Sequence, residues 1–276
     1  MAATEKERPL LQLGPQDAVS ALELSREAQW NQNEADWRYF LSKGIVYGLR
    51  DSASNLIATA ALLPYTRREA WISMVLVTES RRRQGLATRL VDACLDAAMR
   101  LGLTVWLDAT PAGAAVYGPL GFLPTIQLRR LRLERDGSST SVGEISPGKL
   151  GDFISCDINA MGFDRRALIT DLSGRAGSRL LSTNDAMALV RDGRTTRHIG
   201  PVFANNPDSA LALVAAIVAS ERGAHLIDAV ADQTAFLDGL MRAGWTMERP
   251  FQRMRFGRTA VSAGEPPFAV AGPEFG

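Results

Sequence analysis

The segment between residues 71 and 107 limits the choice of fold more than any other part of the chain. It contains a nearly continuous apolar run, Trp71–Val77, then a polar turn rich in arginine, a helical pattern that opens at Gly85, and a second apolar run, Leu103–Leu107. Apolar runs of this kind are typical of strands that are buried on both faces of a sheet. Between them, apolar residues recur at the spacing of one helix face. This order predicts an α/β fold in which helices flank a mixed β-sheet.

The same order of elements recurs in the second half of the chain. A strand pair joined at Asp192-Gly193 is followed by a helix, a strand and another helix, and Gly244-Trp245 corresponds to Gly121-Phe122 in the first half. A segment of linker composition, residues 135–143, separates the halves. We therefore predict two diverged copies of one α/β unit, each with a central mixed sheet flanked by helices. The predicted parts are a first domain at 1–135, a second domain at 144–256 and a flexible tail, rich in Gly, Ala and Pro, at 257–276.

The turn before Gly85 is a candidate site for an anion. A helix start leaves backbone N–H groups without an intrahelical partner, and these groups and the helix dipole attract negative charge. Gly85 permits close approach of the backbone, Ala87 keeps the first turn open, and the neighbouring arginines offer charged donors to phosphate oxygens. The spacing Arg82-x-x-Gly85-x-Ala87 matches neither a Walker A loop nor the GxGxxG fingerprint. The turn is therefore a phosphate-site candidate of a different type.

Two segments of the first half together resemble the GNAT superfamily of N-acetyltransferases. The run Val75–Ala87 is similar to that family's strand-loop-helix signature, whose loop reads [Arg/Gln]-x-x-Gly-x-[Gly/Ala], and Val116–Phe122 is similar to its Leu-Tyr-x-x-x-Gly-Phe segment. The resemblance covers residues 16–128. Further segments resemble a two-domain subgroup with a degenerate GNAT-like C-terminal half; these are Trp30-Asn31, Trp71, 107–111, 162–165 and 198–201.

The resemblance implies acetyl-CoA as the co-substrate. It implies that the turn and the helix start hold the pyrophosphate of CoA, that strand residues pair with the pantetheine arm where two parallel strands splay apart, and that Tyr117 faces the thioester sulfur. The implied cofactor-binding residues are Leu76, Val77, Arg82, Arg83, Gln84, Gly85, Leu86, Ala87 and Thr88. We assign Trp30, Asn31 and Asp108 to the acceptor substrate.

The expected mechanism is direct transfer without an acyl-enzyme. A neutral amine attacks the thioester carbonyl, a strand N–H stabilises the oxyanion, and Tyr117 acts as general acid toward the leaving thiolate. A phenol of pKa about 10 is a reasonable proton donor to a thiolate of pKa about 8.5. The amine must also lose a proton, and Asp108, Asp36 and a chain of water molecules remain alternatives for the base.

Composition argues against several classes of partner and site. The 31 Lys+Arg and 30 Asp+Glu residues leave a net charge of +1, which gives no electrostatic reason to expect nucleic acid or membrane as a partner. Cys94 and Cys156 form no CxxC pair, so we expect no disulfide framework and no bound metal. The N-terminus lacks the apolar core of a signal peptide, and the longest apolar run, residues 210–219, is about half of a membrane span. We expect a cytoplasmic protein, and a homo-oligomer is compatible with the sequence.

These features predict an N-acetyltransferase that moves an acetyl group from acetyl-CoA to the primary amine of a small metabolite. Two alternatives stay open: a non-catalytic CoA-binding sensor or regulatory module, and an acetyltransferase for protein N-termini or lysines. In the second half, residues 205–209 lack arginines and a glycine opening, and Asp208 would repel phosphate. We therefore expect that half to bind no CoA and to line the acceptor pocket, with one cofactor per chain.

Overall fold

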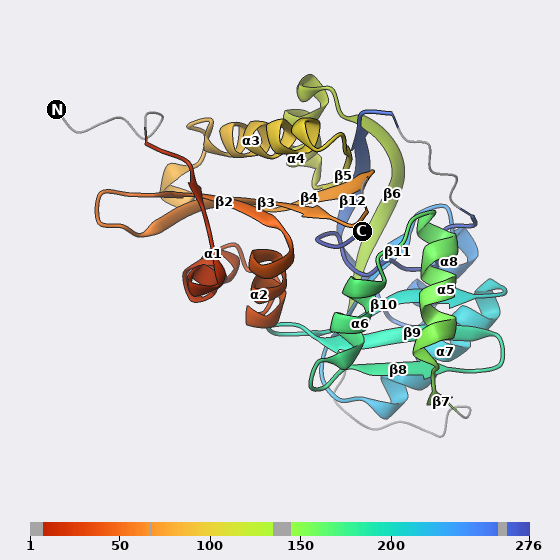
Figure 1. The fold of residues 1–276 in the computed structure, drawn as a ribbon. Coiled ribbons are helices and arrows are strands. Elements are labelled where there is room, and N and C mark those ends of the chain that lie inside the picture. Colours follow the sequence, from red (N-terminus) through yellow and green to blue (C-terminus); the bar gives the residue numbers. More distant parts are fainter. Residues whose placement is uncertain (1–7, 67, 135–144, 259–263) are drawn as a thin grey trace. The chain divides into compact units, whose positions relative to one another are not determined.

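The chain folds into two compact units that exchange segments (Figure 1). The computed structural model describes residues 8–66, 68–134, 145–258 and 264–276. Within these ranges the first unit comprises residues 8–66, 68–107 and 255–258, and the second comprises residues 108–134, 145–254 and 264–276. The predicted linker at 135–143 lies outside the described residues. The linear domain boundaries at 1–135 and 144–256 stay a prediction.

The first unit has a mixed sheet with helices on both faces. In its described residues the strand order is β1-β2-β3-β4-β5. Successive strands from β1 to β4 pair antiparallel, whereas β4 and β5 pair in parallel. Helices α1 and α2 lie on one face and α3 lies on the other (Figure 1). The elements are β1 Leu11–Gln12, η2 Pro15–Asp17, α1 Ala18–Glu27, α2 Glu34–Lys43, β2 Ile45–Arg50, β3 Leu56–Pro64, β4 Glu69–Val77, η3 Glu79–Arg81, α3 Leu86–Arg100 and β5 Thr104–Ala109.

Helix α3 joins the two parallel strands, as the apolar pattern predicts. Its buried residues, among them Leu90, Val91 and Cys94, form one face at helical spacing. Gly102 follows the helix with a φ of +67°, a left-handed conformation that glycine adopts without a steric penalty. The buried face packs on β3 and β4, where Leu62 and Trp71 are fully enclosed. This packing holds the start of α3 at the end of β4.

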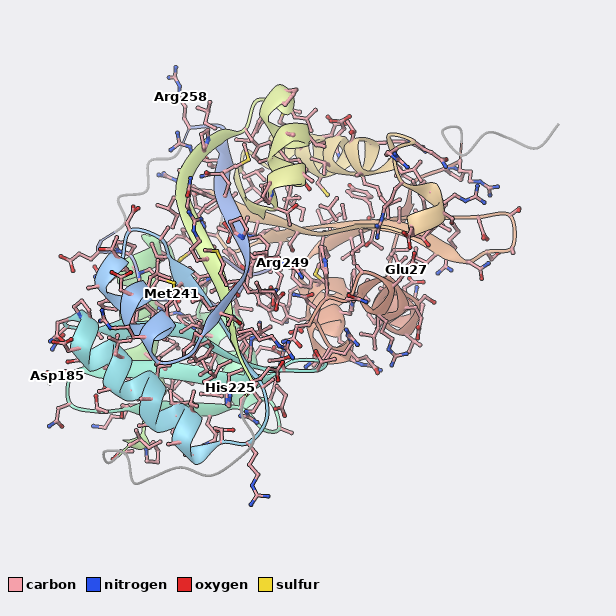
Figure 2. All side chains as sticks on the ribbon, turned by 180° about the vertical axis from the view of Figure 1, so that it is seen from behind. Glu27, Asp185, His225, Met241, Arg249 and Arg258 are labelled. Atoms are coloured by element: carbon pink, nitrogen blue, oxygen red, sulfur yellow. The ribbon has the colours of Figure 1, made fainter. Side chains whose placement is uncertain are left out.

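The second unit repeats this arrangement. In its described residues the strand order is β12-β6-β11-β10-β9-β8-β7. Helices α5 and α6 lie on one face, and α7 and α8 lie on the other (Figures 1 and 2). The elements are α4 Pro111–Tyr117, η4 Gly118–Leu120, β6 Leu123–Leu133, β7 Ser146–Pro147, α5 Leu150–Met161, α6 Arg166–Gly174, β8 Arg179–Ser182, β9 Ala186–Asp192, β10 Arg197–Ala204, α7 Pro207–Ser220, β11 His225–Val230, α8 Thr234–Arg242 and β12 Thr246–Phe256.

The predicted internal repeat is confirmed at the level of element order. The series β2-β3-β4-α3-β5-α4-β6 in the first half corresponds to β8-β9-β10-α7-β11-α8-β12 in the second. Spatial pairing departs from that order, because β6 pairs antiparallel with β11, from Leu128 opposite Val230 to Leu133 opposite His225. Residues 255–258 return to the first unit, where the Thr104 hydroxyl donates a hydrogen bond of 2.7 Å to the Arg258 carbonyl. Each half of the sequence therefore contributes a segment to the other unit.

The described part of the segment predicted as a flexible tail is packed in the second unit, which corrects that expectation for residues 264–276. Ala269 bridges to Val202 and Ala229, and it is fully buried. The Arg191 guanidinium donates to the Ala271 carbonyl at 3.1 Å. Gly, Ala and Pro suggest flexibility by composition, but small residues also allow a segment to lie close against a sheet. Buried arginines satisfy its carbonyl groups.

Candidate active site

Strands β4 and β5 pair only over their first residues. Their parallel register runs from Glu69 opposite Thr104 to Trp71 opposite Trp106. The indole rings of Trp71 and Trp106 stack at 6.4 Å between centroids with an interplanar angle of 9°. Beyond this pair, β4 continues to Val77 without pairing with β5. The two strands therefore splay, as the family resemblance implies for the strands that receive pantetheine.

A distortion in β4 lies within the splayed part. Met74 has a φ of +52°, and the register with β3 shifts between Thr59 and Ala61. The buried Thr59 hydroxyl donates a hydrogen bond of 2.9 Å to the Met74 carbonyl, which holds the distorted residue in place. Past the shift, Leu76 and Val77 pair with β3 on one side. The opposite edge of β4 is the edge that could pair with an extended ligand, as the resemblance implies for these two residues.

The start of α3 presents open backbone donors. Gly85 is the N-cap residue with a φ of +79°, and no side chain caps the helix. The first helical hydrogen bond runs from the Arg89 N–H to the Gly85 carbonyl at 3.1 Å. The N–H groups of Leu86, Ala87 and Thr88 precede that bond and have no place in the helical ladder. Such a helix start suits an anion.

The arginine turn before the helix adds positive charge at the same place. Arg82 and Arg83 are exposed and Gln84 is half-buried. The Arg82 Nε donates to the Val77 carbonyl at 3.2 Å, so this guanidinium is held against the end of β4. Arg83 has a φ of +61°. Open N–H groups, a left-handed turn and two arginines fit the diphosphate of CoA, and the binding role of these residues stays a prediction.

Glu27, which no sequence motif singles out, braces this turn (Figure 2). It is the last residue of α1, and its carboxylate accepts hydrogen bonds from the Thr78 hydroxyl at 2.7 and 2.8 Å and from the Glu79 N–H at 2.5 Å. The bond from the Glu79 backbone, the bond from Thr78 and the nearby Arg82 together lower the pKa of Glu27 below its ordinary value, against the opposing effect of burial. The carboxylate therefore stays ionised at neutral pH and ties α1 to the turn. No local pattern connects residues that lie 51 positions apart.

Tyr117 lies at the end of α4, in the second unit. The helix begins as predicted: the Thr110 hydroxyl accepts a hydrogen bond from the Gly113 N–H at 3.2 Å, and Pro111 is the first helical residue. The half-buried Tyr117 ring packs beside Phe122 at 5.9 Å between centroids. A Cβ atom at Gly113 would lie 3.1 Å from the Tyr117 ring, so the absence of a side chain there leaves room for it. The role of Tyr117 as general acid stays a prediction.

Both carboxylates considered for the base have structural partners. The buried Asp108 carboxylate accepts two hydrogen bonds from the Arg253 guanidinium, at 2.8 and 2.9 Å. Burial raises the pKa of Asp108, and Arg253 counteracts that rise. Asp36 is buried in the first turn of α2, where its Oδ2 accepts from the Asn33 N–H at 2.9 Å. These contacts favour a structural role for both carboxylates.

Trp30 and Asn31 lie in the connection between α1 and α2. Both are half-buried, and the Trp30 N–H donates to the Ser25 carbonyl at 2.9 Å. Ser25 also accepts a hydrogen bond of 2.9 Å from the Trp37 indole, which anchors the connection to α2. The structure thus holds Trp30 and Asn31 on a braced loop. Their assignment to the acceptor stays a prediction.

The corresponding junction of the second unit, between β10 and α7, lacks an open helix start. The Asn206 side chain accepts a hydrogen bond of 2.9 Å from the Ser209 N–H. Pro207 has no N–H, and Asp208 places a negative charge in the first turn. The backbone donors that are open at α3 are therefore capped, missing or opposed by a negative charge at α7. This contrast supports the prediction that the second half binds no CoA.

A Gly85→Ala variant is expected to raise the dissociation constant of acetyl-CoA by about tenfold. A left-handed conformation costs a residue with a Cβ roughly 1–2 kcal/mol, and a turn that relaxes to avoid that cost moves the N–H groups away from the phosphates. Titration calorimetry of the purified chain measures this. Gly102→Ala is the matched control, because Gly102 also has a positive φ, at the other end of α3. An equal loss of affinity in both variants would argue against a phosphate site at Gly85.

Among the described residues, no three or more His, Cys, Asp or Glu side chains gather where they could hold a metal ion. No helix in the described ranges is long and apolar enough to cross a membrane.

Comparison with known proteins places both halves in one family. A model described as "Acetyltransferase (GNAT) family" matches residues 14–122, and one described as "Acetyltransferase (GNAT) domain" matches residues 153–265. The chain is similar to the uncharacterized N-acetyltransferase YitH of Bacillus subtilis (strain 168), with 23% identity over 250 residues that cover 86% of this chain and 87% of that protein.

Solved structures show the same fold over nearly the whole chain. A Pyrococcus horikoshii protein described as an acetyltransferase has a TM-score of 0.80 at 17% identity, and the match covers 99% of this chain and 97% of that one. A tandem GNAT protein from the clavulanic acid biosynthesis pathway has a TM-score of 0.65 at 14% identity, with 92% and 100% covered. At this identity the likeness supports the fold.

Proposed function

The chain belongs to the GNAT acetyltransferase family, with two GNAT domains in tandem, and on that premise we propose that it acetylates the primary amine of a small metabolite. Acetyl-CoA supplies the acetyl group, activated as a thioester. The observation that carries the proposal is the uncapped start of α3 beside the arginine turn and the splayed part of β4. These features supply backbone donors and positive charge for a diphosphate and a free strand edge for pantetheine.

Different residues of the chain have different roles in the proposed reaction. The N–H groups of residues 83–88 hold the diphosphate, and Leu76 and Val77 orient the pantetheine arm. The Tyr117 hydroxyl donates a proton to the sulfur as the acyl carbon–sulfur bond breaks and the carbon–nitrogen bond forms. The amine nitrogen releases its own proton to solvent through a chain of water molecules, because Asp108 and Asp36 are engaged elsewhere.

One acetyl-CoA is expected to bind per chain. The reason is the difference between the two helix starts: α3 leaves its first N–H groups open, whereas α7 is capped by Asn206 and carries Asp208. Titration calorimetry with acetyl-CoA gives the stoichiometry directly, and the Gly85→Ala variant assigns the site to the first unit. A stoichiometry of two would contradict the assignment.

The nature of the acceptor is tested by thiol release. The purified chain is incubated with acetyl-CoA and separate amines: short aliphatic amines, amino acids, and peptides with a free N-terminus or a lysine. The balanced charge of the chain favours a small acceptor over an extended polyanion or membrane. Release of CoA with a small amine is expected. Turnover only with peptides would indicate a protein acetyltransferase, and tight acetyl-CoA binding without turnover on any amine would indicate a sensor.

A further inference from the structure

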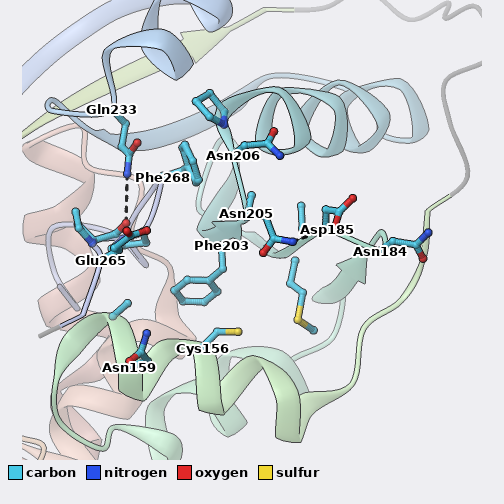
Figure 3. A pocket seen from close by; sticks show the side chains of 17 residues that line it. Cys156, Asn159, Asn184, Asp185, Phe203, Asn205, Asn206, Gln233, Glu265 and Phe268 are labelled. Carbon is cyan, nitrogen blue, oxygen red and sulfur yellow. Dashed lines mark hydrogen bonds between the residues drawn. The ribbon is translucent and has the colours of Figure 1, made fainter.

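A cavity of about 560 Å³ lies in the second unit, where β10 ends and α7 begins. Figure 3 shows it between α5, which carries Cys156 and Asn159, and the β10–α7 junction, which carries Phe203 and Asn205. Its volume is in the range of small-molecule sites. In the repeat, this junction corresponds to the β4–α3 junction that forms the candidate cofactor site in the first unit. The second half has therefore kept a cavity at the equivalent position.

The lining of this cavity has the opposite charge to the arginine turn. Among the described residues that line it there is no Lys, Arg or His, whereas Asp185 and Glu265 each contribute a carboxylate. The capped helix start of α7, with Asp208 in its first turn, adds no positive end for an anion. A cation is the ligand that this electrostatic arrangement favours.

The polar side chains that line the cavity carry amide and carboxylate oxygens as well as amide N–H donors. The Asn205 amide NH₂ donates to Asp185 Oδ1 at 3.0 Å, and the Gln233 amide NH₂ donates to the Pro266 carbonyl at 3.3 Å (Figure 3). Each of these amides thus uses one of its two N–H donors within the protein, and its carbonyl oxygen is an acceptor. Together with the carboxylates, these oxygens match a ligand that carries several N–H donors.

The apolar walls are held by aromatic contacts. Phe203 packs edge-on against Phe153 at 5.1 Å between centroids, and Phe268 packs in the same way against Phe236 at 5.3 Å. Phe153 and Phe236 are fully buried, so the two lining rings rest on the core of the unit. Aromatic rings also attract cations. The walls suit a short aliphatic chain next to a positive charge.

We propose that the cavity at the β10–α7 junction binds a small organic cation with a primary ammonium group on a short aliphatic chain. The ammonium group faces one of the two carboxylates, Asp185 beside Asn205 on one side of the cavity or Glu265 beside Gln233 on the other (Figure 3), and the aliphatic chain lies along Phe203. Residues of the second unit form the whole site. It does not depend on acetyl transfer, and the tandem repeat thus has an anion site in one half and a cation site in the other.

Titration calorimetry of the full chain without acetyl-CoA tests the proposal. Putrescine is the probe, with 1,4-butanediol as its neutral counterpart and succinate as its anionic one. Putrescine is expected to bind at least about tenfold more tightly than either, because only it places charge opposite the carboxylates. The double variant Asp185→Asn, Glu265→Gln removes both charges at nearly constant shape and is expected to lose at least about tenfold in putrescine affinity. Asp238→Asn, an exposed carboxylate on α8 that does not line the cavity, is the matched control and should bind as the parent chain does.

Alkylation of Cys156 locates the ligand independently. This half-buried thiol lines the cavity, whereas Cys94 is enclosed in the core of the first unit, where burial raises its pKa to about 12. Putrescine should slow the modification of Cys156 by iodoacetamide, measured by mass spectrometry, and should not do so in the double variant.

Three results would each overturn the proposal: no putrescine binding at millimolar concentration, equal binding of 1,4-butanediol, or unchanged putrescine binding in the double variant. The Gly85→Ala variant should bind putrescine normally, so failure of this site and failure of the cofactor site are separable.

Discussion

A Tyr117→Phe variant is expected to lower the turnover of acetyl transfer roughly 100- to 1,000-fold and to leave acetyl-CoA affinity nearly unchanged. A positioned general acid contributes on the order of 10²–10⁴-fold to a rate, and this substitution removes only the hydroxyl that would donate the proton. The ring remains, and with it the packing on Phe122 and over Gly113. The fold should therefore be kept. Steady-state thiol release gives kcat and KM, and calorimetry gives the affinity for acetyl-CoA.

The kinetic pattern distinguishes a proton donor from a packing residue. Loss of an interaction made only in the transition state lowers kcat and kcat/KM together. Tyr47→Phe removes the same hydroxyl from a half-buried tyrosine of β2 and is expected to have no effect on turnover. If Tyr117→Phe turns over as fast as the parent chain, Tyr117 is not the general acid, and the proton reaches the thiolate from water.

Features set by neighbouring residues could be predicted from the sequence. The start of α3 follows from Gly85, whose left-handed conformation few other residues adopt, and from the apolar spacing of the helix behind it. The start of α4 follows from Thr110 and Pro111, whose cap and fixed backbone angle both favour a first helical turn. Each of these interactions joins residues only a few positions apart, so it can be predicted from a short stretch of sequence.

Features that join distant parts of the chain could not be predicted in this way. The pairing of β6 with β11 places Arg130 opposite Asp228, 98 positions away, and alternation within a strand does not say which strand is its neighbour. The contact of Glu27 with Thr78 is of the same kind. The sequence makes Asp108 a candidate base, but in the structure its carboxylate is bound by Arg253, which lies 145 positions away in the chain. The catalytic role of a carboxylate depends on which charged side chains contact it, and distant contacts of this kind cannot be read from the sequence.

The pairing of β6 with β11 brings together a buried network of charges in the second unit. Arg130 donates from Nε and Nη2 to the two carboxylate oxygens of Asp228, both at 2.8 Å, and His198 Nε2 lies 2.9 Å from Asp228 Oδ2. Asp228 is fully enclosed. Burial would raise the pKa of Asp228, but Arg130 and the bond from His198 outweigh that effect and hold the pKa well below its ordinary value. Burial lowers the pKa of His198, so its neutral ring donates the Nε2 hydrogen to the carboxylate.

An Asp228→Asn variant is expected to lower the free energy of unfolding by about 3–5 kcal/mol near neutral pH, because it leaves the buried Arg130 without its counter-charge. Asp164→Asn is the matched control: it breaks an exposed pair with Arg166, which should contribute at most about 1 kcal/mol. Because the folded-state pKa of Asp228 is lowered, its contribution is complete above the unfolded-state pKa of about 3.9 and is lost as the pH falls through the folded-state value. The difference between the parent chain and Asp228→Asn should therefore narrow below about pH 4, measured by denaturant unfolding at a series of pH values. A difference of less than about 1 kcal/mol at neutral pH would show that the network contributes no more than a surface pair.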